Sequence, residues 1–185
     1  MSGNLALLRV AEGKGGQCQL GVNRHDATLD CDDRWPPITD IAAEVRIDGS
    51  KLLIDASSAR VQSAQIGATH AEIADLHDAH PVLQIDGTAS GPTIQFLAFV
   101  ANSPVADWIG HFNDDASASG DGRLALKFEL PLHDPAQTTI AGEYQFASNG
   151  VQIAGVPPLT DVNGKLLFTA HAIRATDLTA RASGG

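Results

Sequence analysis

Apolar and polar residues alternate through most of this sequence, and this period-two pattern constrains the fold more than any other feature. Successive side chains of a β-strand point to opposite faces, so alternation is typical of strands that bury one face. A hairpin is predicted where the turn Asp48-Gly49-Ser50 separates a run around Val45 from a run around Ile54. Similar runs occur near 59–61, 66–68, 71–73, 83–85, 124–130, 140–146, 151–153 and 166–168. The sequence therefore predicts a mainly β fold built from antiparallel hairpins.

The composition excludes several classes of partner. The chain has 185 residues, with 22 acidic and 12 basic side chains and a formal net charge of −10. Nucleic-acid phosphates are bound by clustered cations, which this sequence lacks, so no nucleic-acid partner is expected. No apolar run approaches the roughly 20 residues that a membrane-spanning helix needs, so no membrane span is expected within the chain. The length suits one domain with a sizeable core.

One stretch departs from the alternation and predicts a helical insertion. Residues 93–101 (TIQFLAFVA) are apolar on every side, and Ser103 with Pro104 then provides an N-cap and a first helical residue. After this restart, apolar residues recur at helical spacing as far as residue 112. We therefore predict a short two-helix insertion at about 93–112 that caps the sheet. The residues predicted to form this helical cap are Phe96, Leu97, Val105, Trp108 and Phe112.

An internal repeat organises the chain. The segment WPPITDI at 35–41 reappears as VPPLTDV at 156–162, an offset of 121 residues, and similar strands follow both copies. The same offset relates Ala59-Arg60 to Ala180-Arg181. A doubled proline forbids helix, and the Thr-Asp pair after it favours a turn of the chain. This repeat predicts an open, twisted antiparallel sheet that grows by adding hairpin modules.

Residues with catalytic or metal-binding chemistry do not form a recognisable site. His70, His77 and His80 have no cysteine partner and no metal-binding helix motif, so they are interpreted as polar loop and strand residues. The acidic pairs at 32–33 and 114–115 lie in segments rich in small polar residues, where carboxylates cap turns. The sequence therefore predicts no catalytic residue, no metal ligand, no cofactor and no enzymatic activity.

The two cysteines of the chain, Cys18 and Cys31, lie 13 residues apart. That spacing permits a disulfide in an oxidising compartment, but two cysteines in a chain of this length do not form a disulfide framework. The sequence leaves open whether they are paired or free.

Several segments, taken in order, resemble the YhdP-like branch of the AsmA-like envelope proteins, which are relatives of TamB. The resemblance covers about residues 27–185. Its motifs are Leu29-Asp30-Cys31 before Trp35-Pro36, the segment GTASGPTIQFLAFVANSPVADW at 87–108, GRLALKFELPL at 122–132, and the ending at 180–185. Each motif is short and apolar, so their order and spacing carry more weight than any one of them.

This resemblance implies a function as well as a fold. Members of the family are long proteins anchored in the inner membrane of Gram-negative bacteria, with a periplasmic β-groove that carries phospholipid toward the outer membrane. The chain is then expected to be a periplasmic segment of a longer protein, with residues 1–26 as an N-terminal edge containing a strand region and 27–185 as one β-groove segment. Adjoining segments of the parent protein would be its partners, together with phospholipid acyl chains.

The alternation indicates which residues would contact lipid. Residues two apart share a strand face, so a continuous apolar strip requires the apolar residues of each strand to stay at alternate positions. The strip is predicted to include Val45, Ile47, Leu52, Ile54, Leu124, Leu126 and Phe128. The alternative is a structural or interaction module whose sheet edges pair with neighbouring modules and which binds no ligand. A closed barrel is less favoured, because the helical insertion and the Pro-Pro corners favour an irregular open sheet.

Overall fold

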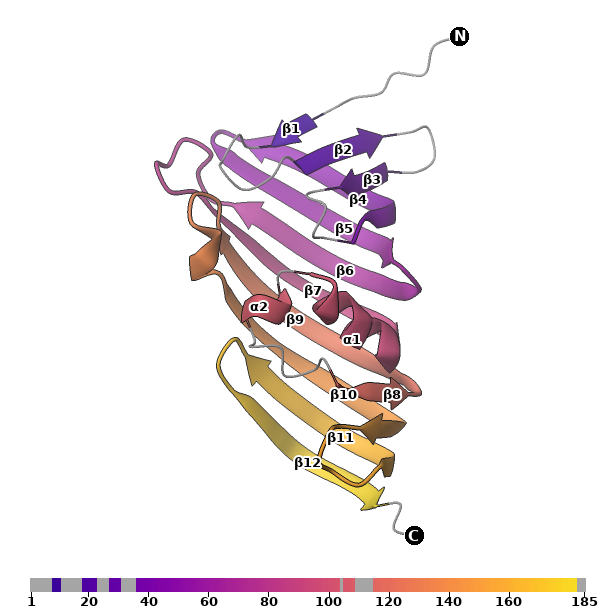
Figure 1. The fold of residues 1–185 in the computed structure, drawn as a ribbon. Coiled ribbons are helices and arrows are strands. Elements are labelled where there is room, and N and C mark those ends of the chain that lie inside the picture. Colours follow the sequence, from indigo (N-terminus) through magenta and orange to yellow (C-terminus); the bar gives the residue numbers. More distant parts are fainter. Residues whose placement is uncertain are drawn as a thin grey trace.

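The computed structural model describes residues 8–10, 18–22, 27–30, 36–103, 105–108 and 115–182, with side chains described from residue 36 onward except at 104, 107–114 and 135. Most elements are strands, and the two α-helices follow each other between β7 and β8 (Figure 1). The first strands are β1 (Leu8–Val10), β2 (Cys18–Val22), β3 (Ala27–Asp30), β4 (Ile38–Asp48), β5 (Lys51–Val61), β6 (Ala64–Ile73) and β7 (Val82–Pro92). Then follow α1 (Thr93–Ala101), α2 (Val105–Trp108), β8 (Ser117–Ser119), β9 (Asp121–Pro131), η1 (Pro135–Gln137), β10 (Thr139–Gln152), β11 (Leu159–Thr169) and β12 (Ile173–Ala182).

The described strands form one antiparallel sheet that does not close. Its order is β1 to β7 followed by β9 to β12, and the short strand β8 pairs with the end of β10. Each strand therefore pairs with its neighbour in sequence, except that α1, α2 and β8 are inserted between β7 and β9. This arrangement confirms the mainly β, open antiparallel sheet predicted from the alternation.

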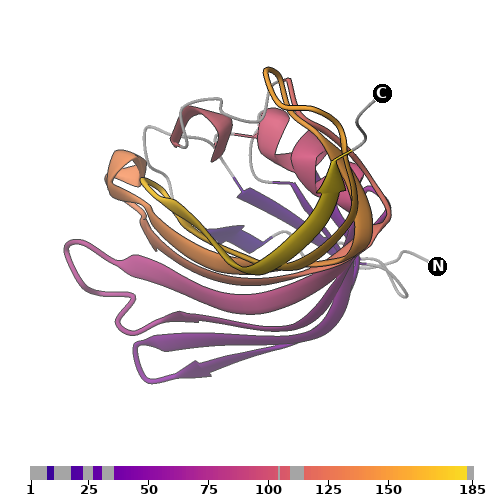
Figure 2. The same ribbon diagram turned by 90° about the horizontal axis from the view of Figure 1, so that it is seen from below.

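The sheet is strongly curved, with the helices on its concave side (Figure 2). Register shifts occur in β4, β6, β10 and β11, and all of them lie toward the same ends of the strands, where β7 runs into α1. A β-bulge bends its strand and increases the local twist, so neighbouring bulges at one side turn that side of the sheet inward. By contrast, β7 and β9 pair without a shift from Val82 to Pro92.

The helical insertion differs from its prediction. A single helix of more than one turn is described, α1, while α2 is one turn long, so the two-helix insertion is not confirmed. The Ser103 hydroxyl donates to the carbonyl of Val100 at 3.2 Å, at the end of α1, and the Ser103 carbonyl accepts from the N–H of Ala106 at 3.1 Å, at the start of α2. Phe112 lies outside the described residues, as does the side chain of Trp108. Cys31 also lies outside them, so the pairing of the cysteines stays open.

The internal repeat has a structural counterpart. Asp40 and Asp161 hold the same position in the two copies, and both have a left-handed backbone, with φ values of 52° and 51°. Each aspartate forms an ion pair with the arginine at the matching position of the next strand: Arg60 lies 3.3 Å from Asp40, and Arg181 lies 3.2 Å from Asp161. The hairpins β4–β5 and β11–β12 therefore share one local geometry, although 121 residues separate them.

Candidate functional site

The concave face of the sheet is lined by apolar side chains that continue from strand to strand. Directly opposed residues of antiparallel strands share a face, so the register identifies this surface. One row of opposed residues runs from β4 to β10 as Val45, Ile54, Ala71, Ile85, Phe128 and Ile140. The next row runs as Ile47, Leu52, Ile73, Leu83 and Leu130. We call this surface the concave apolar face.

All seven residues predicted for a lipid strip lie on the concave apolar face. Leu124 and Leu126 join it through rows that continue to Leu166 and Phe168 on β11. Their burial differs: Leu52 is 5% exposed, Val45 and Ile47 are 46% and 67% exposed, and the other four are half-buried. Much of this face is therefore apolar surface that the chain itself does not cover.

The concave apolar face is covered in part by α1. Phe96 on the helix meets the Tyr144 ring edge to face, with ring centroids 5.5 Å apart and planes at 74°. Tyr144 also contacts Phe146, two residues along β10, at 4.9 Å. Beyond the helix, Val105 of α2 is buried. Of the predicted helical cap, Val105 is thus buried, while Phe96 and Leu97 are half-buried.

A buried polar cluster joins the start of α1 to β10. Thr93, the first residue of α1, accepts hydrogen bonds at Oγ1 from the Tyr144 hydroxyl at 2.8 Å and from the Asn149 amide at 2.7 Å. Asn149 has no exposed surface, and its Oδ1 accepts from the backbone N–H of Ala147 at 2.6 Å. Its amide also donates to the carbonyl of Ser119 at 3.0 Å. Burial raises the pKa of the Tyr144 phenol, so it remains a neutral donor.

The alternation did not reveal this cluster. Asn149 lies in Ser148-Asn149-Gly150, which is typical of a turn, whereas the structure places it inside β10 next to a register shift. Ser148 has a left-handed backbone with φ of 56°, which marks the bulge. A polar residue beside glycine within an alternating run was the one available signal, and it is also the signal of an ordinary loop.

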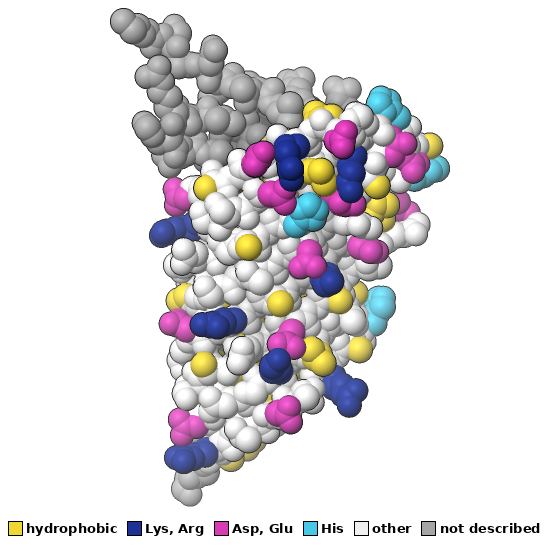
Figure 3. Space-filling view, turned by 180° about the vertical axis from the view of Figure 1, so that it is seen from behind, with side chains coloured by type: hydrophobic (Ala, Val, Ile, Leu, Met, Phe, Trp, Pro, Cys, Tyr) yellow, Lys and Arg dark blue, Asp and Glu magenta, His cyan; other side chains and the backbone are white. Residues whose placement is uncertain are grey.

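The convex face has the opposite character, with charged side chains spread across it (Figure 3). Arg46 and His70 both contact Asp55, at 2.7 Å and 2.6 Å. Further ion pairs across neighbouring strands join Lys51 to Glu72, Lys127 to Asp86 and Lys165 to Glu143, at 2.8 to 3.1 Å. The sheet is therefore amphipathic, apolar on its concave face and charged on its convex face.

His70 and Asp55 shift each other's pKa. The hydrogen bond from His70 is the main cause that lowers the pKa of Asp55, and the hydrogen bond from Arg46 adds to it. The same contact with Asp55 raises the pKa of His70, with a smaller contribution from Glu72 at 3.5 Å. His70 thus belongs to a surface ion-pair network.

The other histidines considered in the sequence lie apart from this network. His77 contacts the carboxylate of Asp75 at 3.6 Å, and the ring of His80 lies 6.4 Å from that of His133. Among the described residues, no group of three His, Cys, Asp or Glu side chains is placed to hold a metal ion. Within the same residues, no helix is both long enough and apolar enough to span a membrane.

The fold and its two faces define a class of protein: an open, curved β-sheet with an exposed apolar lining and a hydrophilic outer surface. The sequence model of the family described as YhdP protein matches residues 1–185, so the chain belongs to the YhdP family. Membership of this family indicates an AsmA-like protein of the bacterial envelope. Neither the curated proteins nor the solved structures include a significant match to the sequence.

Proposed function

We propose that this chain is a non-enzymatic, periplasmic segment of a longer inner-membrane-anchored protein, and that it carries phospholipid between the inner and outer membranes. Acyl chains would lie along the concave apolar face, which forms a groove. The supporting observation is the continuity of that face: its rows of opposed residues overlap so that together they extend from β4 to β12, and no charged side chain enters them. Eight strands at the usual spacing of about 4.8 Å extend this lining over about 34 Å.

The energetics favour an occupant of this kind. Removing apolar surface from water stabilises by about 25 cal/mol per Å², and an acyl chain supplies such surface without any hydrogen-bonding group that needs a partner. Ile54, Leu126 and Phe128 are half-buried in the chain alone, so an acyl chain laid over them would complete their burial. A contiguous exposed apolar surface of this size is typical of a binding surface rather than of a monomer's exterior.

Site-specific photo-crosslinking tests the proposal. A photo-reactive phenylalanine analogue is placed at Ile54 or Leu126 in the full-length parent protein, and adducts are identified by mass spectrometry. The matched controls are Leu53 and Ala125, which are adjacent in sequence but project from the convex face. We expect phospholipid adducts at the concave positions only.

The alternative function, a structural module without ligand, makes a different prediction in the same experiment. Its concave positions would give protein adducts or none, because the face would be covered by neighbouring modules. Equal lipid labelling of both faces would also contradict a groove, since it would indicate nonspecific membrane contact.

A further inference from the structure

Two histidines oppose each other just beyond the paired part of β7 and β9, at the end of the sheet away from α1. The N–H of Leu132 donates to the carbonyl of Pro81 at 3.0 Å, so the antiparallel register of the two strands continues for one residue past their ends. His80 and His133 are the next pair in that register. They belong to the loop before β7 and the loop after β9, which are distant from each other in the sequence.

The register brings the two imidazole rings together. Side chains at directly opposed positions of antiparallel strands share a face, with Cβ atoms about 4.5 to 5.5 Å apart. The ring centroids of His80 and His133 are 6.4 Å apart, with the ring planes at 86°. Both side chains are exposed, and neither ring forms a hydrogen bond or ion pair with any described residue. Their ring nitrogens are therefore available to a ligand.

Hydrogen bonds in both loops hold the histidines in place. The backbone N–H of His80 donates to Oδ1 of Asp78 at 2.9 Å. Next to His133, the N–H of Asp134 donates to the carbonyl of Pro131 at 3.2 Å. These turns leave the rings free to rotate while their backbones stay opposed. Each histidine also lies within two residues of an aspartate in the sequence, so the local charge favours a cation.

We propose that His80 and His133 together bind one divalent transition-metal ion, and that Cu²⁺ binds more tightly than Ni²⁺ or Zn²⁺. Neutral imidazole is the commonest protein ligand for such metals, and Cu²⁺ has the highest affinity in their usual order. A metal ion holds each imidazole nitrogen at about 2.0 to 2.1 Å, which places two ring centres about 5 to 6 Å apart, so side-chain rotation closes this pair on the ion. Water completes the coordination, because no third His, Cys, Asp or Glu among the described residues is placed to join them.

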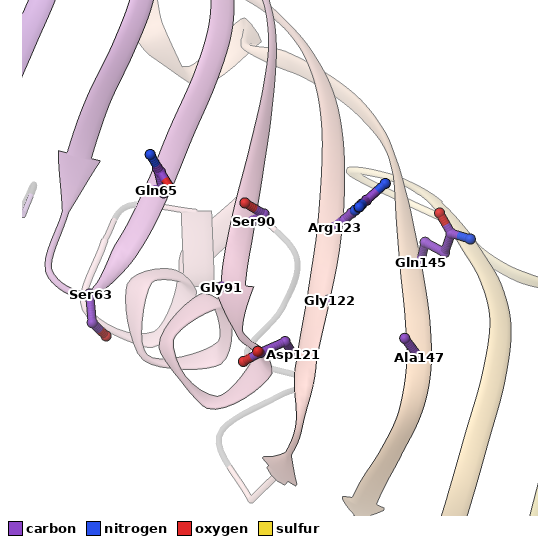
Figure 4. A pocket seen from close by; sticks show the side chains of 9 residues that line it. All are labelled: Ser63, Gln65, Ser90, Gly91, Asp121, Gly122, Arg123, Gln145 and Ala147. Carbon is purple, nitrogen blue, oxygen red and sulfur yellow. The ribbon is translucent and has the colours of Figure 1, made fainter.

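The opposed imidazoles distinguish this pair from other polar parts of the surface. The depression on the convex face over β7, β9 and β10 is lined by polar side chains that extend in different directions, so it offers no converging ligand atoms (Figure 4). In the sequence His77 is much closer to His80 than His133 is, but its ring contacts the carboxylate of Asp75 at 3.6 Å. The sheet register, rather than local spacing, therefore selects the partner of His80.

Calorimetric titration of the full chain with copper(II) chloride tests the site, with both cysteines replaced by serine so that thiols do not compete for the metal. We expect one Cu²⁺ per chain. The affinity should be about tenfold or more weaker in His80→Gln and in His133→Gln, because losing a ligand costs at least as much as losing a group that orients one. The matched controls are His77→Gln and His171→Gln, which change exposed loop histidines at the same end of the sheet and should leave the affinity unchanged.

Thermal unfolding provides a second measurement. Cu²⁺ should raise the melting temperature of the chain, because it binds the folded arrangement of the two loops, and this rise should be absent in His133→Gln. Without metal, every variant should melt as the parent does, since the side chains that change are exposed. Unchanged affinity in His80→Gln, or an equal loss in His77→Gln, would overturn the proposal. So would an electron paramagnetic resonance spectrum of the copper-loaded chain that shows coupling to a single imidazole.

Discussion

The hydroxyl of Tyr144 donates a hydrogen bond to Oγ1 of Thr93 at 2.8 Å, which joins the middle of β10 to the first residue of α1. The two residues are 51 positions apart in the sequence. Because Asn149 donates to the same oxygen from inside the sheet, the helix begins at a fixed point on the concave apolar face. Phe96, one turn further along α1, then packs against the Tyr144 ring.

The two donors to Thr93 should differ in their contribution to stability. Tyr144→Phe removes one hydrogen bond and keeps the ring, so we expect a loss of about 1 kcal/mol in the free energy of unfolding. Asn149→Ala removes the partner of the buried Thr93 hydroxyl and of three part-buried backbone groups, so a larger loss of about 3 kcal/mol is expected. Urea denaturation followed by circular dichroism measures both. Equal losses would show that the Asn149 contacts are replaced by water.

Glycines on the concave apolar face leave room for aromatic rings. A Cβ at Gly142 would overlap the ring of Phe168, its direct partner on β11. Gly142→Ala should therefore cost about 1 to 3 kcal/mol, the usual range for overpacking. In a Phe168→Leu background the same substitution should cost less, because the ring that it displaces is gone. A double-mutant cycle from denaturation midpoints measures this coupling, and strict additivity would contradict it.

Much of the sheet could be predicted from the sequence because alternation directly encodes the strand face. Val45 and Phe128 were assigned to one strip on parity alone, and the register places both on the concave apolar face. The prediction of strand faces fails where the apolar residues shift from even to odd positions or back. Between the runs near 59–61 and 66–68 the alternation is interrupted, and there residues 62–63 form the turn between β5 and β6, where Gln62 has φ of 53°. A bulge and a tight turn both interrupt the alternation by a residue or two, so the local pattern does not distinguish them.

The helical insertion shows a second limit. The spacing from Val105 to Phe112 fits a helix, and the structure describes one turn of it, Val105–Trp108, because residues 109–112 lie outside the described residues. Short helices depend on tertiary contacts more than on helix propensity. Those contacts involve residues that are distant in the sequence, so the local sequence does not predict them. The same applies to the buried cluster at Asn149, which depends on strands that are distant along the chain.

The repeated aspartates provide a test of the repeat itself. Asp40 and Asp161 both have a left-handed backbone, which aspartate tolerates better than alanine and glycine tolerates best. Alanine at either position should therefore lower the free energy of unfolding by about 1 kcal/mol, whereas glycine should be close to neutral. The exposed ion pairs to the arginines contribute less than this difference. Unequal behaviour of the two positions in thermal denaturation would show that the repeat is one of sequence only.

The network at Asp55 should make stability depend on pH in a defined direction. Because its pKa is raised, His70 contributes fully below its unfolded pKa of about 6.5, and this contribution is lost as the pH rises through the folded value. The lowered pKa of Asp55 acts in the opposite sense: its contribution is present above about pH 4 and is lost as the pH falls further. The network should therefore stabilise most between about pH 4 and 6.5.

An NMR titration of the His70 ring checks this directly. Asp55→Asn should bring the pKa of His70 back toward 6.5. Glu72→Gln should change it less, because the contact with Glu72 is longer, at 3.5 Å against 2.6 Å. A larger effect of Glu72→Gln would reverse the assignment of the main partner.

Charges placed on the concave apolar face should separate lipid contact from folding. Ile54 and Leu126 are half-buried, so aspartate at either position can reach water when no lipid is bound, and the melting temperature should fall only modestly. An acyl chain over the same carboxylate would leave it without solvent or partner, so phospholipid crosslinking to the full-length parent should be lost. Leu52 is 5% exposed, and Leu52→Asp should unfold the segment outright, which calibrates the response of a closed core. Ala125→Asp, on the convex face beside Leu126, should change neither measurement. Unfolding of both Ile54→Asp and Leu126→Asp would instead indicate that the concave apolar face is packed against protein in the parent, as a structural module requires.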